Sequence, residues 1–207
     1  MEIYRFRCCC ILFILTKKNR PGMAVRENGY SDWGGMRMNS RKKQIFLCAA
    51  VVLLGSVFHF LYDWFPCLLT ALFAPVNESL WEHLKIFFFP CLIGFLFLTK
   101  GRKDELAPYL WFLPWLCGLM LAAAWGYHIT LGGDALWVDL LLFAVLVVLA
   151  FLLPAVFPNA GGRLWPLTVL LNAGLCLAIW IFTFAPPDHL LFADLSKADF
   201  LFPPCLL

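Results

Sequence analysis

Charge is scarce in this chain of 207 residues. Only 14% of the residues are charged, whereas 62% are hydrophobic and the mean hydropathy is +0.81. A soluble globular domain carries roughly 25% charged residues, so this composition excludes that class of protein. The net charge of +3 would suggest an acidic partner for a soluble protein. Here the positions of the cations report membrane topology instead, and we expect a lipid bilayer and no nucleic acid as partner.

Motifs of well-known enzymes are also missing. The chain has no His-Glu-x-x-His, no Gly-x-Ser-x-Gly and no Walker loop, and its nine cysteines show no metal-type spacing. Four cysteines lie inside apolar runs, where the side chain acts as a small hydrophobe. Cys67 and Cys205 are expected on one side of the membrane, where an oxidising environment would allow them to pair. The sequence therefore leaves open whether the protein is an enzyme.

Long apolar runs occupy most of the remaining chain. Most of them are about as long as the roughly 20 residues that a helix needs to cross a bilayer. We predict an all-α fold: a polytopic membrane helix bundle of about five transmembrane helices. The predicted spans are residues 45–62, 79–99, 108–127, 136–157 and 164–184.

Basic residues are distributed unevenly around these spans. In an arrangement with the N-terminus inside, 14 of the 16 Lys and Arg residues fall on the cytoplasmic side, and only Lys85 and Lys197 fall outside. The same arrangement places all four histidines on the outer side. We predict a bacterial cytoplasmic membrane as the location, with the N-terminus in the cytoplasm.

Three regions follow from this reading. Residues 1–43 carry ten Lys or Arg residues and only a short apolar run, so we expect a disordered basic cytoplasmic tail. Part of this tail is expected to be an over-long gene start. Residues 44–184 form the five-span bundle. Residues 185–207 form an extracytoplasmic tail that packs on the outer mouth of the bundle.

Two polar or helix-breaking residues are expected inside spans. Pro114 should kink its helix, which is tolerated when neighbouring helices satisfy the freed carbonyl group. Asn172 lies in the middle of a span, where a hydrogen bond to another helix is a more common role than ligand binding.

A polar stretch, PVNESLWEHLK at residues 75–85, lies between long apolar runs. Ser79 with Glu82 three residues later forms a capping-box pattern, so we predict that a helix starts here. The apolar run that follows, residues 86–98, has only 13 residues, which is too short to span. If this helix crosses the membrane, Glu82, His83 and Lys85 lie at the membrane edge, where ionisable groups are usually kept for a function.

Spacing along the first two predicted helices suggests a site. His59 and Asp63 share a helix face, as do Glu78, Glu82 and Lys85. Carboxylates and imidazoles from two helices can bind a divalent transition metal, form a proton relay or act as a general acid and base. The candidate metal ligands are His59, Asp63, Glu78, Glu82 and His83, and the candidate catalytic residues are Glu82 and His83. A structural alternative remains open: Glu82 caps its helix, and Lys85 pairs with a neighbouring carboxylate or extends to the interface.

Four segments resemble a known family. They are HFLYDW at 59–64, the PVNESLWEHLK stretch, FTFAPP at 182–187 and LFAD at 191–194. Together they are similar to an uncharacterised family of small bacterial integral membrane proteins, mostly from Firmicutes, over about residues 43–200. Asp139 matches a further polar position of that family. The resemblance implies a multi-span membrane fold and supplies no activity. Our candidate ligand-binding residues are Asn77, Glu78 and Asp139.

Three functions are compatible with these observations. The leading hypothesis is an outward-facing polar pocket that binds a small ligand or a divalent transition metal, for transport or sensing. The first alternative is a membrane-embedded enzyme that acts on a lipid or envelope precursor. The second is a structural or assembly protein without an active site. The sequence leaves the oligomeric state open.

Overall fold

The computed structural model describes residues 40–200. This part of the chain is all-helical and contains no strand. The helices are α2 (Ser40–Trp64), α3 (Leu68–Phe73), α4 (Leu84–Thr99), α5 (Lys103–Ala124), the π-helix η1 (Trp125–Thr130), α6 (Leu136–Val156), α7 (Trp165–Phe184), and the 3₁₀ helices η2 (Leu190–Phe192) and η3 (Leu195–Phe200). Of the predicted basic tail, residues 1–39 lie outside the described residues. The remaining four are part of α2.

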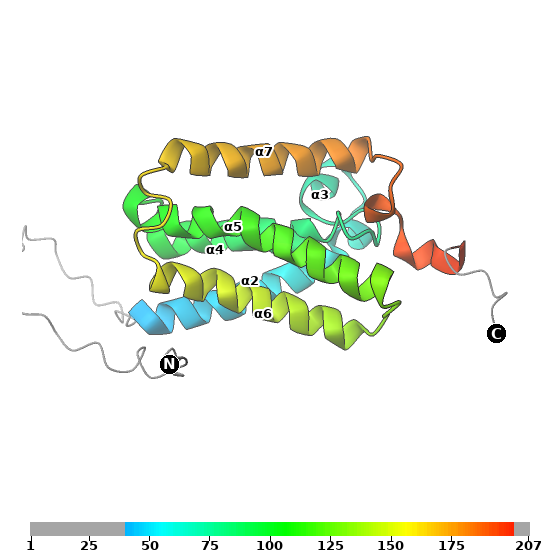
Figure 1. Cartoon of the computed structure of the whole chain (residues 1–207), viewed down its shortest axis with the longest axis horizontal. Helices are drawn as coiled ribbons and strands as arrows, with labels where there is room; N and C mark the ends of the chain where they lie inside the picture. The colour runs from blue at the N-terminus through cyan, green and yellow to red at the C-terminus, as the bar shows by residue number, and fades with distance from the viewer. Residues whose placement is uncertain (1–39, 201–207) are drawn as a thin grey trace, which may run out of the picture. The chain divides into compact units, whose positions relative to one another are not determined.

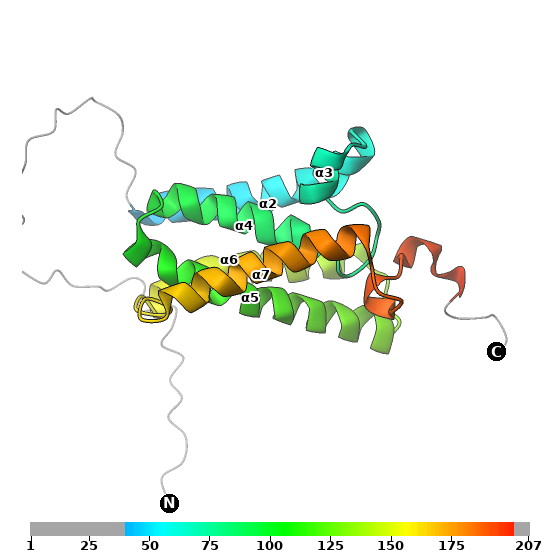
Figure 2. The same cartoon turned by 90° about the horizontal axis from the view of Figure 1, so that it is seen from above.

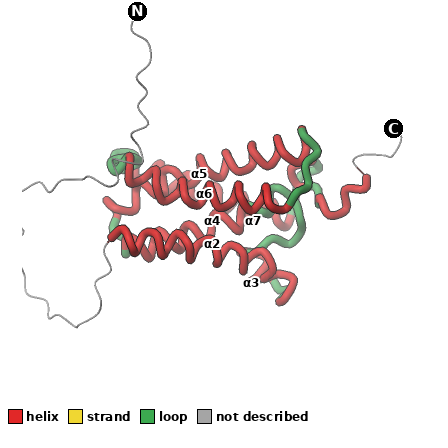
Figure 3. The backbone as a smooth tube through the Cα atoms, turned by 90° about the horizontal axis from the view of Figure 1, so that it is seen from below, coloured by secondary structure: helices red, strands yellow, loops and turns green. Residues whose placement is uncertain are grey.

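Four helical segments are long and apolar enough to cross a membrane: residues 41–64 in α2, residues 103–130 in α5 with η1, then α6 and α7. They run beside one another in both views of the bundle, together with α4 (Figures 1 and 2). The tube in Figure 3 shows loops and short helices gathered at the two ends of these rods. The prediction of an all-α membrane bundle is confirmed.

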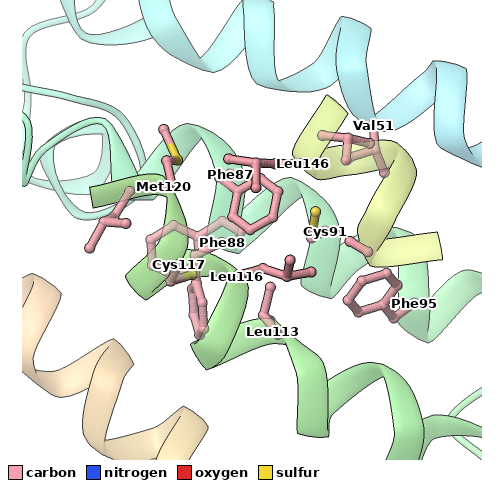
Figure 4. Close-up of a cluster of buried hydrophobic side chains, with 14 of the residues drawn as sticks. Val51, Phe87, Phe88, Cys91, Phe95, Leu113, Leu116, Cys117, Met120 and Leu146 are labelled. Carbon is pink, nitrogen blue, oxygen red and sulfur yellow. The ribbon is translucent and has the colours of Figure 1, made fainter. Parts of the chain in front are cut away.

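The helix α4 is shorter than the other four. Its 16 residues span about 24 Å, less than the roughly 30 Å of a hydrocarbon core. Eleven of its 16 residues are nevertheless buried, because it packs against α2, α5 and α6. Figure 4 shows Phe87, Phe88 and Phe95 of α4 among Leu113 of α5 and Leu146 of α6. Non-helical backbone at the start of α4 is therefore covered by protein rather than by lipid, which is the condition under which membranes tolerate it.

A glycine allows α2 to approach α4 closely. A Cβ atom on Gly55 would lie 2.8 Å from the carbonyl oxygen of Ile86 and would also collide with the ring of Phe143. Pro90 lies within α4 and has no N–H group, so the Ile86 carbonyl lacks its usual helical donor. Glycine, which has no side chain, thus lies where the Ile86 carbonyl of α4 faces α2.

Pro114 creates the same problem in α5, and a polar side chain solves it. The missing N–H of Pro114 frees the carbonyl of Leu110, four residues earlier. Asn172 of α7 donates a hydrogen bond from Nδ2 to this oxygen at 2.8 Å and is only 7% exposed. The expected hydrogen bond of Asn172 to another helix is present, and the two residues form one pair: Asn172 supplies the donor that Pro114 removes. The kink at Pro114 stays a prediction.

We therefore predict that Asn172→Leu lowers the unfolding free energy by about 1–2 kcal/mol, because the Leu110 carbonyl loses its donor inside the bundle. Pro114→Ala restores a backbone N–H at that turn. In the double variant the loss from Asn172→Leu should shrink, which thermal or denaturant unfolding in detergent micelles can measure. Strictly additive effects of the two substitutions would contradict the pairing.

Cations and imidazoles lie at opposite ends of the bundle. Lys43 at the start of α2 donates to the carbonyl oxygens of Phe97 and Leu98 at the end of α4, at 3.0 and 3.1 Å. Lys103 lies over the ring of Trp165, 5.7 Å from its centroid. We call this end, with Lys43, Lys100, Arg102 and Lys103, the basic end. It lies at the left in Figure 1, where the loop between α6 and α7 is also found.

The other end carries the histidines, and we call it the imidazole end. His59 lies 5.4 Å from His83 between ring centroids, and His189 stacks on Trp125 at 5.5 Å. His128 belongs to the π-helix that begins at Trp125. The separation on which the predicted orientation rests is thus present in the structure, while the assignment of the basic end to the cytoplasm stays a prediction.

Candidate functional site

The site is built on the loop between α3 and α4, residues 74–83. Pro75 starts the loop, and Asn77 closes a local turn by accepting a hydrogen bond from the Ser79 amide at 3.1 Å. Ser79 accepts from the Glu82 amide at 3.3 Å, which is the first half of the predicted capping box. The second half is missing, because the Glu82 carboxylate accepts from the Val76 amide instead. The predicted helix start at Ser79 is wrong: α4 begins at Leu84.

A lysine is buried at the base of this loop. Lys85 is fully buried, and its Nζ donates to the Glu82 carboxylate at 2.6 Å and to the carbonyl oxygens of Ala71 and Ala74 at 2.6 and 3.2 Å. An ammonium group has three donors, so every one of them is used. The bonds to Ala71 and Ala74 hold the end of α3 against the first turn of α4.

Glu82 completes this network and is 2% exposed. Its Oε2 receives Lys85 and the Val76 amide, and its Oε1 accepts from the Thr183 hydroxyl of α7 at 2.9 Å. Both carboxylate oxygens are thus occupied, and they connect the loop to α4 and α7. The structure places Glu82, a predicted catalytic and metal-binding residue, in a network that holds the loop in position.

This network predicts a non-additive effect on stability. Lys85→Met should lower the unfolding free energy by about 3–5 kcal/mol, because it leaves the Glu82 carboxylate buried without a counter-charge. Adding Glu82→Gln removes that charge, so the double variant should be more stable than Lys85→Met alone. Thermal unfolding of the four proteins of this cycle in one detergent checks the prediction, and a double variant less stable than both single ones would contradict it.

Three other side chains converge above the network. His59 of α2, with Glu78 and His83 of the loop, offers three ligand atoms that all lie within 4.8 Å of one another. The shortest approach is 3.3 Å between His83 Nε2 and Glu78 Oε2. We call His59, Glu78 and His83 the imidazole–carboxylate cluster. The structure thus brings together three of the five predicted metal ligands.

A backbone carbonyl orients His83. Its Nδ1 lies 2.8 Å from the carbonyl oxygen of Ser79, which can only accept, so Nδ1 carries the proton and donates. The other ring nitrogen, Nε2, then faces Glu78. A ring nitrogen that donates to a backbone carbonyl and so orients the other nitrogen is typical of histidines that bind metals.

The two loop residues influence each other's protonation. Burial lowers the pKa of His83, but the hydrogen bond with Glu78, the Ser79 carbonyl and the nearby carboxylates more than reverse this, so the pKa of His83 is raised overall. The bond with His83 lowers the pKa of Glu78 despite partial burial. At neutral pH the cluster therefore attracts a positive charge, either a proton or a metal cation.

His59 is the least satisfied member of the cluster. Its Nδ1 is buried and has no hydrogen-bond partner among the described residues. A buried polar atom without a partner is costly, and it is explained when the atom binds an ion or a water molecule. The atom belongs to His59, which is the one member of the cluster that α2 contributes.

The remaining predicted site residues lie elsewhere. Asp63 is exposed and does not belong to the cluster, although it follows His59 by one helical turn. Asn77 serves the loop turn described above. Asp139, in the first turn of α6, accepts from His128 at 2.9 Å and acts on His83 only as a neighbouring charge.

Two partners of the loop were not named by the sequence analysis, although it expected the tail after residue 184 to pack on the outer mouth of the bundle. Thr183, which binds Glu82, lies in the FTFAPP segment, so its place in a shared motif was the available signal. The other partner is the C-terminal strap, which we define as residues 190–197. The Trp81 amide donates to Leu191 at 3.1 Å, and the Leu195 amide donates to the Glu78 carbonyl at 3.3 Å. In Figure 1 this strap is the red segment beyond the end of α7.

Comparison with known proteins identifies the family without adding an activity. The model of a family of unknown function, DUF6512, matches residues 35–200. No curated protein and no solved structure matches the chain. The match agrees with the resemblance to a family of unknown function, and the bacterial source stays a prediction.

Proposed function

We propose that this chain, which belongs to the family of unknown function DUF6512, is a membrane protein that binds a divalent transition metal through His59, Glu78 and His83. Two imidazoles and one carboxylate suit first-row ions such as Zn²⁺. The site serves sensing or transport of the ion.

The observation that carries this proposal is the pairing of His83 with Glu78. Because the Ser79 carbonyl fixes the proton on Nδ1, the Nε2 lone pair of His83 points to a carboxylate oxygen 3.3 Å away. Two acceptors in this position require either a proton or a metal cation between them. A metal ion meets this requirement and is also within reach of a ring nitrogen of His59.

Accessibility supports reversible binding. The side chains of Glu78 and His83 are 47% and 26% exposed, so an ion can reach the cluster from solvent. Three protein ligands leave one position of a tetrahedral zinc site for water or another group. An accessible site of this kind suits a protein that takes up and releases an ion, as sensing and transport demand.

The expected location follows from the two ends of the bundle. The basic end faces the cytoplasm by the positive-inside rule, so the cluster faces the outside of a bacterial cytoplasmic membrane. Ions present outside the cell then reach the loop directly. The surrounding partner is the lipid bilayer.

Metal binding tests the proposal directly. Full-length protein purified in detergent without chelator should bind about one Zn²⁺ per chain in equilibrium dialysis or titration calorimetry. His59→Ala and His83→Ala should each weaken binding by tenfold or more, because each removes a direct ligand.

Asp63→Asn is the matched control, since it neutralises an exposed carboxylate one turn from His59 that lies outside the cluster. This variant should bind as the wild type does. Wild-type protein that takes up no zinc would refute the proposal, as would equal loss in the control.

The pH dependence of binding follows from the raised pKa of His83. Protonation of Nε2 competes with the metal, so affinity should fall as the pH falls. Because the folded-state pKa lies above the ordinary value of 6.5, the decline should begin at a higher pH than for an isolated imidazole. Zinc titrations between about pH 8 and 5.5 measure it, and an affinity that stays constant over this range would contradict the role of His83.

A further inference from the structure

The C-terminal strap returns to the loop that carries the metal cluster. Two backbone hydrogen bonds join it to Glu78 and Trp81, and Phe192 packs its ring on Trp81 at 5.2 Å and on Phe182 at 5.3 Å. A segment far along the chain is thereby held beside Glu78. The residue directly before the amide that binds the Glu78 carbonyl is Asp194.

One carboxylate oxygen of Asp194 is held firmly by hydrogen bonds, and the other is held only by an exposed lysine. Its Oδ1 accepts from the Ser196 amide at 3.1 Å and from the Ser196 hydroxyl at 2.7 Å. Its Oδ2 is 3.0 Å from Nζ of Lys197, a side chain that is 82% exposed, whereas the Asp194 side chain is only 18% exposed. An ion pair with such an exposed lysine contributes little, so Lys197 can be displaced by a stronger cation.

Asp194 is held beside the cluster by the backbone. The Leu195 amide that follows it donates to the Glu78 carbonyl oxygen at 3.3 Å, so the two acidic residues lie on adjoining segments. Two carboxylates that repel each other without an ion attract the same ion once it binds. Metal binding at Glu78 therefore changes the interaction between strap and loop from repulsion to attraction.

We propose that Asp194 is the fourth protein ligand of the metal held by His59, Glu78 and His83, with Oδ2 leaving Lys197 to bind the ion. The inference rests on the proposed function, and it fills the fourth position of a tetrahedral site with a carboxylate. Asp194 does not belong to the group of atoms within 4.8 Å of one another, so the strap moves toward the loop when it closes on the ion.

Zinc titration of four full-length proteins tests this assignment. Asp194→Asn should weaken Zn²⁺ binding about tenfold or more, because it removes the ligand charge. Its amide oxygen can still accept from Ser196, so the strap keeps its turn. Lys197→Ala should bind zinc more tightly, because Oδ2 no longer has a competing partner. Asp188→Asn, which neutralises an exposed carboxylate in the same tail, should leave the affinity unchanged.

A spectroscopic measurement separates a ligand from a mere neighbouring charge. Co²⁺ bound to the wild type should show a visible absorption spectrum that changes in Asp194→Asn and stays the same in Asp188→Asn, since only the first changes the coordination shell. If Asp194→Asn keeps both the zinc affinity and the cobalt spectrum while His83→Ala loses binding, the fourth ligand is refuted and the three-residue site stands. If the wild type binds no metal, the proposed function itself fails.

Discussion

The buried ion pair between Lys85 and Glu82 is the interaction on which the geometry of the imidazole end depends. A charge at this depth is retained only if every donor finds an acceptor, and Lys85 meets that condition with one carboxylate and two carbonyls. Glu82 extends the network to the loop and to α7 through Thr183. The loop above it is therefore held in one conformation, and Glu78 and His83 are placed by it.

Much of the bundle could be predicted because it depends on local composition. Runs of apolar residues defined the spans, and the unequal distribution of Lys and Arg separated the two ends. A hydrogen bond of the kind that Asn172 makes could also be predicted, since a proline inside a span leaves a carbonyl that needs a donor from another helix. Each of these rules uses the properties of single residues and of the membrane, and none requires knowledge of which loops touch.

The details of the site required tertiary information. Helical spacing placed Glu78 and Glu82 on one face, but the residues before Leu84 form turns, so the two carboxylates separate. Glu78 meets His83, while Glu82 turns to Lys85 and to a threonine 101 residues away. The Ser79 carbonyl that orients His83 is a backbone group, which leaves no mark in the sequence. Three of five predicted ligands were nevertheless brought together, because α2 ends and α4 begins at the same end of the bundle.

The shortness of α4 bears on how the chain is made. During synthesis a lone α4 would place a charged lysine in lipid with too few apolar residues to bridge the hydrocarbon core. Glu82, the partner of Lys85, precedes α4, but Thr183, which binds the same carboxylate, emerges from the ribosome much later. Stable integration of this helix therefore depends on assembly with later helices, so biogenesis of the protein is a cooperative event and not a stepwise insertion of independent segments.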